Sequence, residues 1–213
     1  MTESLAHPAP DAGATPPARC GLLRPALVLF VLLSVLTGLL YPLAVTGVAQ
    51  TVFAHQANGS LVRRDGRLLG SELIGQTFTA PGHFWGRPSA TTPLPYDGLA
   101  SGGSNLAPGN PALLDAVQAR VQALRAADPE NTRPVPVDLV TTSASGLDPH
   151  ISVAAANYQS GRVARSRGLP PEQVQALVQQ HTEGPWLGFL GEPRVNVLAL
   201  NLALDATRRP AKP

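Results

Sequence analysis

The feature that most constrains this chain is a long apolar run close to its N-terminus. From Pro25 to Ala49 the sequence contains no charged residue. A helix of about 25 residues rises roughly 37 Å, which is enough to cross a hydrocarbon core about 30 Å thick. Because a backbone in lipid must satisfy its own hydrogen bonds, we expect residues 25–50 to form a single transmembrane α-helix. Pro42 lies within the run and should kink this helix locally.

A cleaved signal peptide is the alternative interpretation of the run, with Gly47 and Ala49 at its cleavage site. The run is longer than the about 7–15 residues of a signal-peptide core, which favours a retained anchor. Ser34, Gly38 and Pro42 follow one another at intervals of four residues. This stripe either lets another membrane helix approach closely or has no role beyond a simple anchor.

The basic residues around the run predict its orientation. Arg19 and Arg24 lie just before it, whereas the first Lys or Arg after it is Arg63. Since positive charges favour the cytoplasmic side, we expect a cytoplasmic N-terminus and a C-terminal domain outside the membrane. Residues 1–24 are rich in Ala and Pro without an apolar period, so we expect a disordered tail there.

Composition excludes several classes of function. The net charge of +2, with 14% charged residues, is too weak for a nucleic-acid binder. The single cysteine excludes a disulfide framework. Lys212 is the only lysine, which excludes a P-loop lysine and a Schiff base within the domain. The five histidines show no metal-ligand spacing, so we expect no metal site.

Residues 51–213 are predicted to form one domain of the α+β class, because helices and strands mix without a β-α-β rhythm. Asp65-Gly66 within Leu61–Leu69 predicts a β-hairpin. Asn110 and Pro111 are typical of a helix start. The expected elements after the hairpin are a helix over 111–126, a strand over 135–139, a helical stretch from Asp148-Pro149 to Arg167 and a short helix over 171–181. For residues 195–205 the alternating leucines favour a strand, whereas Glu192-Pro193 before them favours a helix start, and we prefer a helix.

A long segment rich in Gly and Pro, residues 78–110, shows no period of either kind. Loops of this length inside a compact domain are usually functional. The segment contains SGGSN, residues 101–105, which forms either a backbone nest for an anion or a flexible turn.

Another segment, Thr141–Ser152, concentrates hydroxyl groups with an aspartate and a histidine. A membrane-anchored serine hydrolase would use Ser145 or a neighbour as nucleophile, His150 as base and Asp148 to orient it. Alternatively, Asp148 caps a helix that begins at Pro149. Because catalytic triads assemble in space, crowding along the sequence is poor evidence, and we expect no catalytic residues here.

Three arginines, Arg162, Arg165 and Arg167, lie close together on an expected helix. They form either a solvated helix face or a surface that meets acidic groups of a partner. With no visible active site, these features favour a binding or assembly role over catalysis.

Eight motifs follow one another in a specific order and spacing. They are LLYPLAVTGVAQ (39–50), QANGSLV (56–62), GSELIGQTF (70–78), FWGRPSA (84–90), SGGSN (101–105), VPVDLVTTSASGLDPHIS (135–152), RVARSRG (162–168) and GFLGEPRVNVLALNLALD (188–205). Together, over about residues 22–205, they resemble the C subunit of Kdp-type potassium-transporting ATPases, the KdpC family.

The resemblance implies a non-catalytic accessory subunit of a high-affinity, ATP-driven potassium uptake complex in the cell (inner) membrane. The implied partners are a channel-like potassium-binding subunit, a P-type ATPase subunit, a small single-helix subunit and the lipid membrane. Members of the family are described as catalytic chaperones that raise the ATP affinity of the ATPase subunit. Potassium is the ion that the complex transports.

The resemblance also implies a nucleotide-contacting signature at Ser101, Gly102, Gly103, Ser104 and Asn105. A direct nucleotide-binding regulator is therefore an alternative function. ATP is cytoplasmic, however, whereas the expected topology puts these residues outside, and the domain offers no lysine for the phosphates. We expect the topology to hold and ATP to bind with the partner ATPase subunit, coupled to this domain allosterically.

Overall fold

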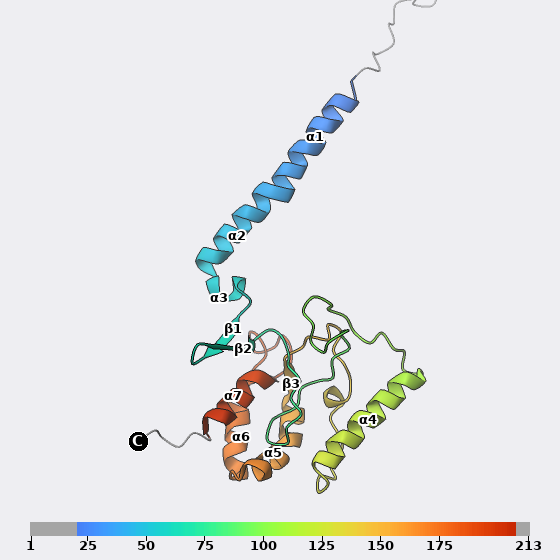
Figure 1. Ribbon diagram of the computed structural model, residues 1–213, viewed down its shortest axis with the longest axis vertical. Helices are drawn as coiled ribbons and strands as arrows, with labels where there is room; N and C mark the ends of the chain where they lie inside the picture. The colour runs from blue at the N-terminus through green and yellow to red at the C-terminus, as the bar shows by residue number, and fades with distance from the viewer. Residues whose placement is uncertain (1–20, 208–213) are drawn as a thin grey trace, which may run out of the picture. The chain divides into compact units, whose positions relative to one another are not determined.

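A computed structural model describes residues 21–207 of the chain (Figure 1). The expected disordered tail over residues 1–24 falls largely outside this range. Internal contacts divide the chain into two units, Met1–Ala57 and Asn58–Pro213. The first unit contains the apolar run, and the second contains all the strands.

The apolar run forms one helical stretch, Leu23–Val52, long and apolar enough to cross a membrane. It consists of α1 (Leu23–Val35), a π-helical turn (Leu36–Leu40) and α2 (Tyr41–Val52), and is followed by the short helix α3 (Ala54–Ala57). Neither α1 nor α2 has a buried residue. The predicted helix is therefore confirmed as one that is long and apolar enough to span a membrane.

The helix accommodates Pro42 through the π-helical turn that directly precedes it. Proline lacks an N–H group, and its ring crowds the carbonyl four residues earlier, which here belongs to Gly38. A widened turn at this point relieves the crowding. Within the turn, the Thr37 hydroxyl donates a hydrogen bond to the Leu33 carbonyl at 2.7 Å.

The second unit begins with the predicted hairpin. Strands β1 (Leu61–Arg64) and β2 (Arg67–Ser71) pair antiparallel. Asp65 and Gly66 have φ angles of 51° and 77°. Because a type I′ turn needs positive φ at both central residues, the predicted turn is confirmed.

Four longer helices follow the hairpin. Asn110 accepts a hydrogen bond from the Ala112 N–H at 2.9 Å, which confirms the predicted helix start. Gly168 ends another helix with a left-handed φ of 64°. The helix predicted within 195–205 is also confirmed. The four are α4 (Pro111–Ala127), α5 (Val153–Arg167), α6 (Pro171–Gln180) and α7 (Val197–Thr207).

The predicted strand over 135–139 is wrong. Val137–Leu139 forms a single 3₁₀ turn. Pro134 and Pro136 lack the N–H groups that a strand would need for pairing, so alternating apolar residues do not suffice here.

The predicted helix start at Asp148-Pro149 is also wrong. Residues His150–Ser152 form strand β3, and the helix begins only at Val153. The N-cap is Ser152, whose Oγ accepts a hydrogen bond from the Ala155 N–H at 3.0 Å.

A three-stranded antiparallel sheet has the order β3-β5-β4, with β4 at Thr182–Glu183 and β5 at Arg194–Asn196. Helix α6 packs against both α5 and α7, and β3 pairs with β5 across more than forty residues of sequence. Together with the helices, this small sheet confirms a mixed α+β domain. The core includes Phe84, Leu139, Ile151, Val163, Val174, Val195 and Leu200, all at most 2% exposed.

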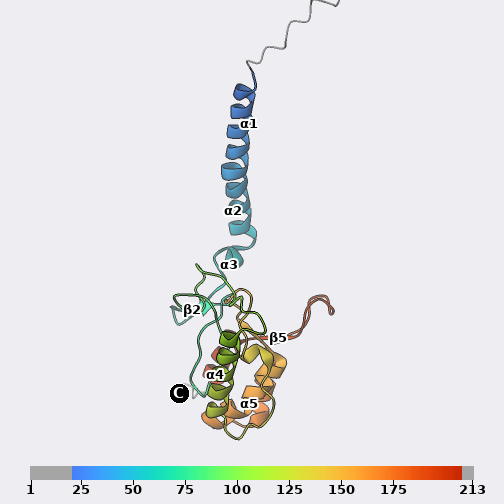
Figure 2. The same cartoon turned by 90° about the vertical axis from the view of Figure 1, so that its right-hand side faces the viewer.

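The segment between β4 and β5 extends away from the rest of the domain as a narrow arm (Figure 2). We call residues 184–191 the apolar arm. Trp186 and Leu190 bond to one another through their backbones at its tip. Trp186, Leu187, Phe189 and Leu190 are 71, 66, 73 and 46% exposed.

Candidate functional site

The FWGRPSA motif lies in the long segment 78–110, which contains no helix or strand, as predicted, up to the start of α4. Its first two residues, Phe84 and Trp85, are buried without a neighbouring strand. Two side-chain amides form the backbone hydrogen bonds that a neighbouring strand would otherwise supply. Asn201 bonds the Phe84 N–H and C=O at 2.8 and 3.0 Å. Gln159 bonds the Trp85 N–H and C=O at 2.8 and 3.1 Å.

This arrangement satisfies four buried backbone groups with two side chains from α5 and α7. The sequence analysis does not predict the role of either amide. The sequence does contain one indication of it, because Asn201 is a polar residue within the apolar stretch LALNLAL of residues 198–204. A buried amide inside such a stretch requires partners, and here the partners are the Phe84 backbone groups.

Arg162 completes the attachment of this segment. It is 3% exposed, and its guanidinium donates to the carbonyls of Pro81 and His83 and to the Gln159 side chain. The guanidinium also lies over the Trp85 ring, 4.8 Å from its centroid. Burial lowers the pKa of Arg162 to about 10, against the attraction of Asp128 and with some repulsion from Arg120.

Of the two interpretations of Arg162, Arg165 and Arg167, the solvated helix face is therefore wrong for Arg162 and Arg167. Arg167 has a side chain only 4% exposed, and it bonds the Gly82 carbonyl and the Asp205 carboxylate. Only Arg165 is half exposed, and it pairs with Asp128 and Glu130. Arg162 and Arg167 hold the 81–85 segment against α5, because this segment covers the face of the helix that carries them.

Segment Thr141–Ser152 is joined to FWGRPSA through Arg87. The Arg87 guanidinium donates to the Asp148 carboxylate at 3.2 Å and to the Thr142 carbonyl at 3.1 Å. Burial alone would raise the pKa of Asp148, but hydrogen bonds from His150 and the charge of Arg87 lower it overall. Asp148 is therefore a structural carboxylate at neutral pH.

The geometry gives His150 carboxylate neighbours. Its Nδ1 lies 3.4 Å from Asp148 Oδ1 and its Nε2 lies 3.8 Å from Glu183 Oε2. Ser145 Oγ accepts from the Leu147 N–H, and Ser152 Oγ contacts Asp138. The hydroxyls proposed for a hydrolase are thus used in turns and caps.

The SGGSN residues pack against the same segment. The Ser101 hydroxyl and the Gly102 N–H both donate to the Ser145 carbonyl, at 3.2 and 2.8 Å. A Cβ added at Gly103 would lie 3.1 Å from the Ala144 carbonyl oxygen, which explains a glycine there. The Gly102 amide that an anion nest would offer is therefore already used. A nucleotide contact by Ser101, Gly102, Gly103, Ser104 and Asn105 stays a prediction.

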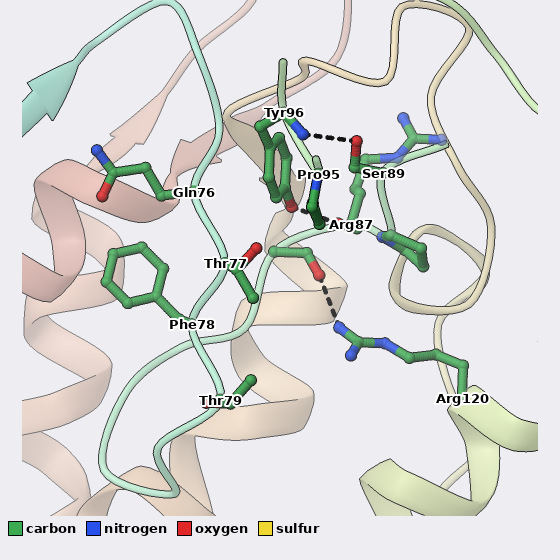
Figure 3. Close-up of a pocket in the computed structure, with 11 residues that line it drawn as sticks. Gln76, Thr77, Phe78, Thr79, Arg87, Ser89, Pro95, Tyr96 and Arg120 are labelled. Carbon is green, nitrogen blue, oxygen red and sulfur yellow. Dashed lines mark hydrogen bonds between the residues drawn. The ribbon is translucent and has the colours of Figure 1, made fainter. Parts of the chain in front are cut away.

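Beside this junction lies a cavity of about 150 Å³, which we call the Arg120 pocket (Figure 3). Arg120 reaches toward it from α4 and donates to the carbonyls of Gly86 and Leu139, at 2.9 and 3.0 Å. The Tyr96 hydroxyl donates to the Arg87 carbonyl at 2.5 Å. Burial raises the pKa of Tyr96, so this phenol is neutral and donates its proton. The polar residues that line the Arg120 pocket include Thr77, Thr79, Arg87, Ser89, Tyr96 and Arg120.

No group of three or more His, Cys, Asp or Glu side chains suited to a metal ion occurs among residues 21–207. The polar clusters around Arg87, Arg120 and Arg162 are instead built on arginine and amide groups. Arginine and amide groups of this kind donate hydrogen bonds to carbonyl oxygens and to anions.

A model of the family "KdpC: K+-transporting ATPase, c chain" matches residues 23–206. The chain is 71% identical over 187 residues to the potassium-transporting ATPase KdpC subunit of Polaromonas naphthalenivorans strain CJ2, covering 88% of this chain and 95% of that protein. It is 70% identical over 186 residues to the subunit of the same name from Variovorax paradoxus strain S110, covering 87% and 96%. For Sorangium cellulosum strain So ce56 the identity is 66% over 186 residues, covering 87% and 98%.

Proposed function

This chain belongs to the KdpC family, the c chain of K⁺-transporting ATPases, and from that premise we propose that it is a non-catalytic accessory subunit of the pump. In this proposal it is needed for the assembly and activity of a high-affinity, ATP-driven potassium uptake complex. The family match includes both the membrane helix and the α+β domain, which supports a role that uses both parts.

The observation that supports a non-catalytic role is that the side chains proposed for catalysis form structural hydrogen bonds. Asp148 holds Arg87, Ser145 forms a turn, and Ser152 caps α5. Each of these three groups instead stabilises a local structure: a contact between two loops, a turn or a helix start. Such a domain supplies a rigid surface to other proteins.

We propose three protein partners: a P-type ATPase subunit, a channel-like potassium-binding subunit and a small single-helix subunit. ATP binds to the ATPase subunit in this account. The accessory subunit raises ATP affinity by favouring one conformational state of that partner, since binding at one site can change affinity at another only through such coupling.

Purified complex lacking this chain should lose potassium-stimulated ATP hydrolysis, because the coupling between ion binding and ATP turnover needs the accessory subunit. The measurement is ATPase activity with and without K⁺ in otherwise matched preparations. Adding back the chain should restore the activity. Full potassium-stimulated activity in the complex without this chain would contradict the proposal.

We further propose that the N-terminus is cytoplasmic and that the domain is outside. Cys20 is the only cysteine, and it precedes the helix, so it serves as a natural reporter of the N-terminal side. A membrane-impermeant maleimide applied to spheroplasts should leave Cys20 unlabelled. It should label Asp115→Cys, an exposed position on α4, when introduced into a Cys20→Ser background. Labelling of Cys20 but not of the position 115 thiol would show the opposite topology.

The apolar arm is proposed to contact another subunit of the complex. Four exposed apolar side chains gathered on one projection are typical of an interaction surface. The double substitution Trp186→Ser and Phe189→Ser should therefore weaken co-purification of the partner subunits by about tenfold or more, as expected for two anchoring aromatic residues. Leu114→Ser, at an exposed leucine on α4, is the matched control and should leave recovery unchanged. Equal recovery with both variants would exclude the arm from the interface.

A further inference from the structure

The Arg120 pocket holds an excess of positive charge. Its lining includes two arginines, Arg87 and Arg120, and no acidic residue. Arg87 is neutralised by Asp148 at 3.2 Å. Arg120 forms no ion pair within residues 21–207, and its hydrogen-bond acceptors there are neutral carbonyls.

A second cation, Arg162, lies close to Arg120, although Asp128 attracts it. Both Arg120 and Arg162 lie over the ring of Trp85, with their guanidinium carbons 5.3 and 4.8 Å from its centroid. Arg162 likewise bonds only carbonyl and amide oxygens among the described residues. Burial lowers the pKa of Arg120, as expected for a guanidinium taken from water without a counter-charge. Charges taken out of water are normally paired, and the half-buried Arg120 has no carboxylate partner among residues 21–207.

Unused donors are available at the pocket. Of the three Arg120 nitrogens, Nε and Nη2 donate to carbonyls, and Nη1 donates to no group in the described part of the chain. Thr77 and Thr79 add hydroxyl groups to the lining, and Figure 3 shows both on the loop that faces Arg120.

We propose that the Arg120 pocket binds one small oxyanion, a carboxylate or a phosphate group, which supplies the counter-charge that Arg120 lacks. Guanidinium groups bind such anions through short, charge-assisted hydrogen bonds. The volume of about 150 Å³ suits a single anionic group and is below the range of about 300–1,000 Å³ typical of larger ligands. None of residues 101–105 lines the pocket, so this site is separate from the family's nucleotide signature.

The test uses the full chain in mild detergent, with sodium phosphate or sodium acetate as the probe and sodium chloride at equal ionic strength as the reference. Phosphate at about ten times its dissociation constant should raise Tm by about 3 to 6 °C. Arg120→Gln should abolish this rise. Arg125→Gln, at an exposed arginine on the same helix, is the matched control and should retain it.

The proposal is overturned if neither probe raises Tm above chloride, or if both raise it equally in wild type and Arg120→Gln. Should Arg120→Gln fail to fold, calorimetric titration of phosphate into the wild-type chain decides: one saturable site per chain supports the proposal, and dilution heat alone overturns it. Because these readouts need no pump activity, their failure leaves the subunit proposal intact.

The assembled complex distinguishes the two sources of the anion. If a carboxylate of a partner subunit fills the pocket, phosphate should leave the Tm of the complex unchanged, and Arg120→Gln should reduce recovery of the partners. If a free anion is the ligand, phosphate should stabilise the complex as well, and Arg120→Gln should leave recovery unchanged.

Discussion

Replacing Arg162 with methionine should lower the free energy of unfolding by about 3 kcal/mol. The substitution removes the donors to the carbonyls of Pro81 and His83, and each buried acceptor left without a partner costs about 1–3 kcal/mol. Methionine fills much of the space of the arginine stem, so the loss comes mainly from hydrogen bonding. In a chain of this size the Tm should fall by about 6 to 12 °C.

The measurement is thermal or urea unfolding of the purified chain in detergent, followed by the fluorescence of Trp85, which lies beneath the Arg162 guanidinium. Trp186, the other tryptophan, is replaced by phenylalanine in all samples so that only the core is observed. Arg125→Met is the control, since that side chain is exposed. If Arg162→Met and Arg125→Met proved equally stable, Arg162 would not hold the 81–85 segment.

Replacing Asn201 with leucine should have an effect of similar size, about 3 kcal/mol. The residue is 1% exposed, and its amide bonds both backbone groups of Phe84. Leucine keeps the volume but leaves a buried N–H and a buried C=O unpaired, each at about 1–3 kcal/mol. The Phe84 amide should then lose protection in hydrogen exchange, because its acceptor is gone.

Hydrogen exchange resolved by residue, together with urea unfolding, measures both effects. Asn157→Leu is the matched control, since Asn157 is an exposed asparagine on α5 whose side chain makes no hydrogen bond within the described chain. Unchanged protection of Phe84 in Asn201→Leu would contradict the proposed role of the amide.

Elements with local signals could be predicted from the sequence. Asp65-Gly66 dictates its own turn because both residues tolerate positive φ, and Asn110-Pro111 starts α4 with a side-chain cap. The long apolar helix that begins near Pro25 could also be predicted, because its length and lack of charge are properties of the local sequence.

Elements that depend on distant partners could not be predicted. Strand β3 exists because β5 pairs with it, and this pairing displaces the helix start from Asp148 to Ser152. Arg162 appears solvated in sequence because the segment that buries it lies about eighty residues earlier. The same holds for the Arg120 pocket, whose lining comes from the long loop and from α4.

The measurement that tests the central claim most directly is a pull-down through a C-terminal tag from native membranes in mild detergent, followed by quantitative mass spectrometry. Our account predicts that a P-type ATPase and a channel-like potassium-binding protein come down with this chain in a fixed ratio. Recovery of the chain alone, under conditions in which the other two proteins remain intact in the membrane, would contradict its role as a subunit of the pump.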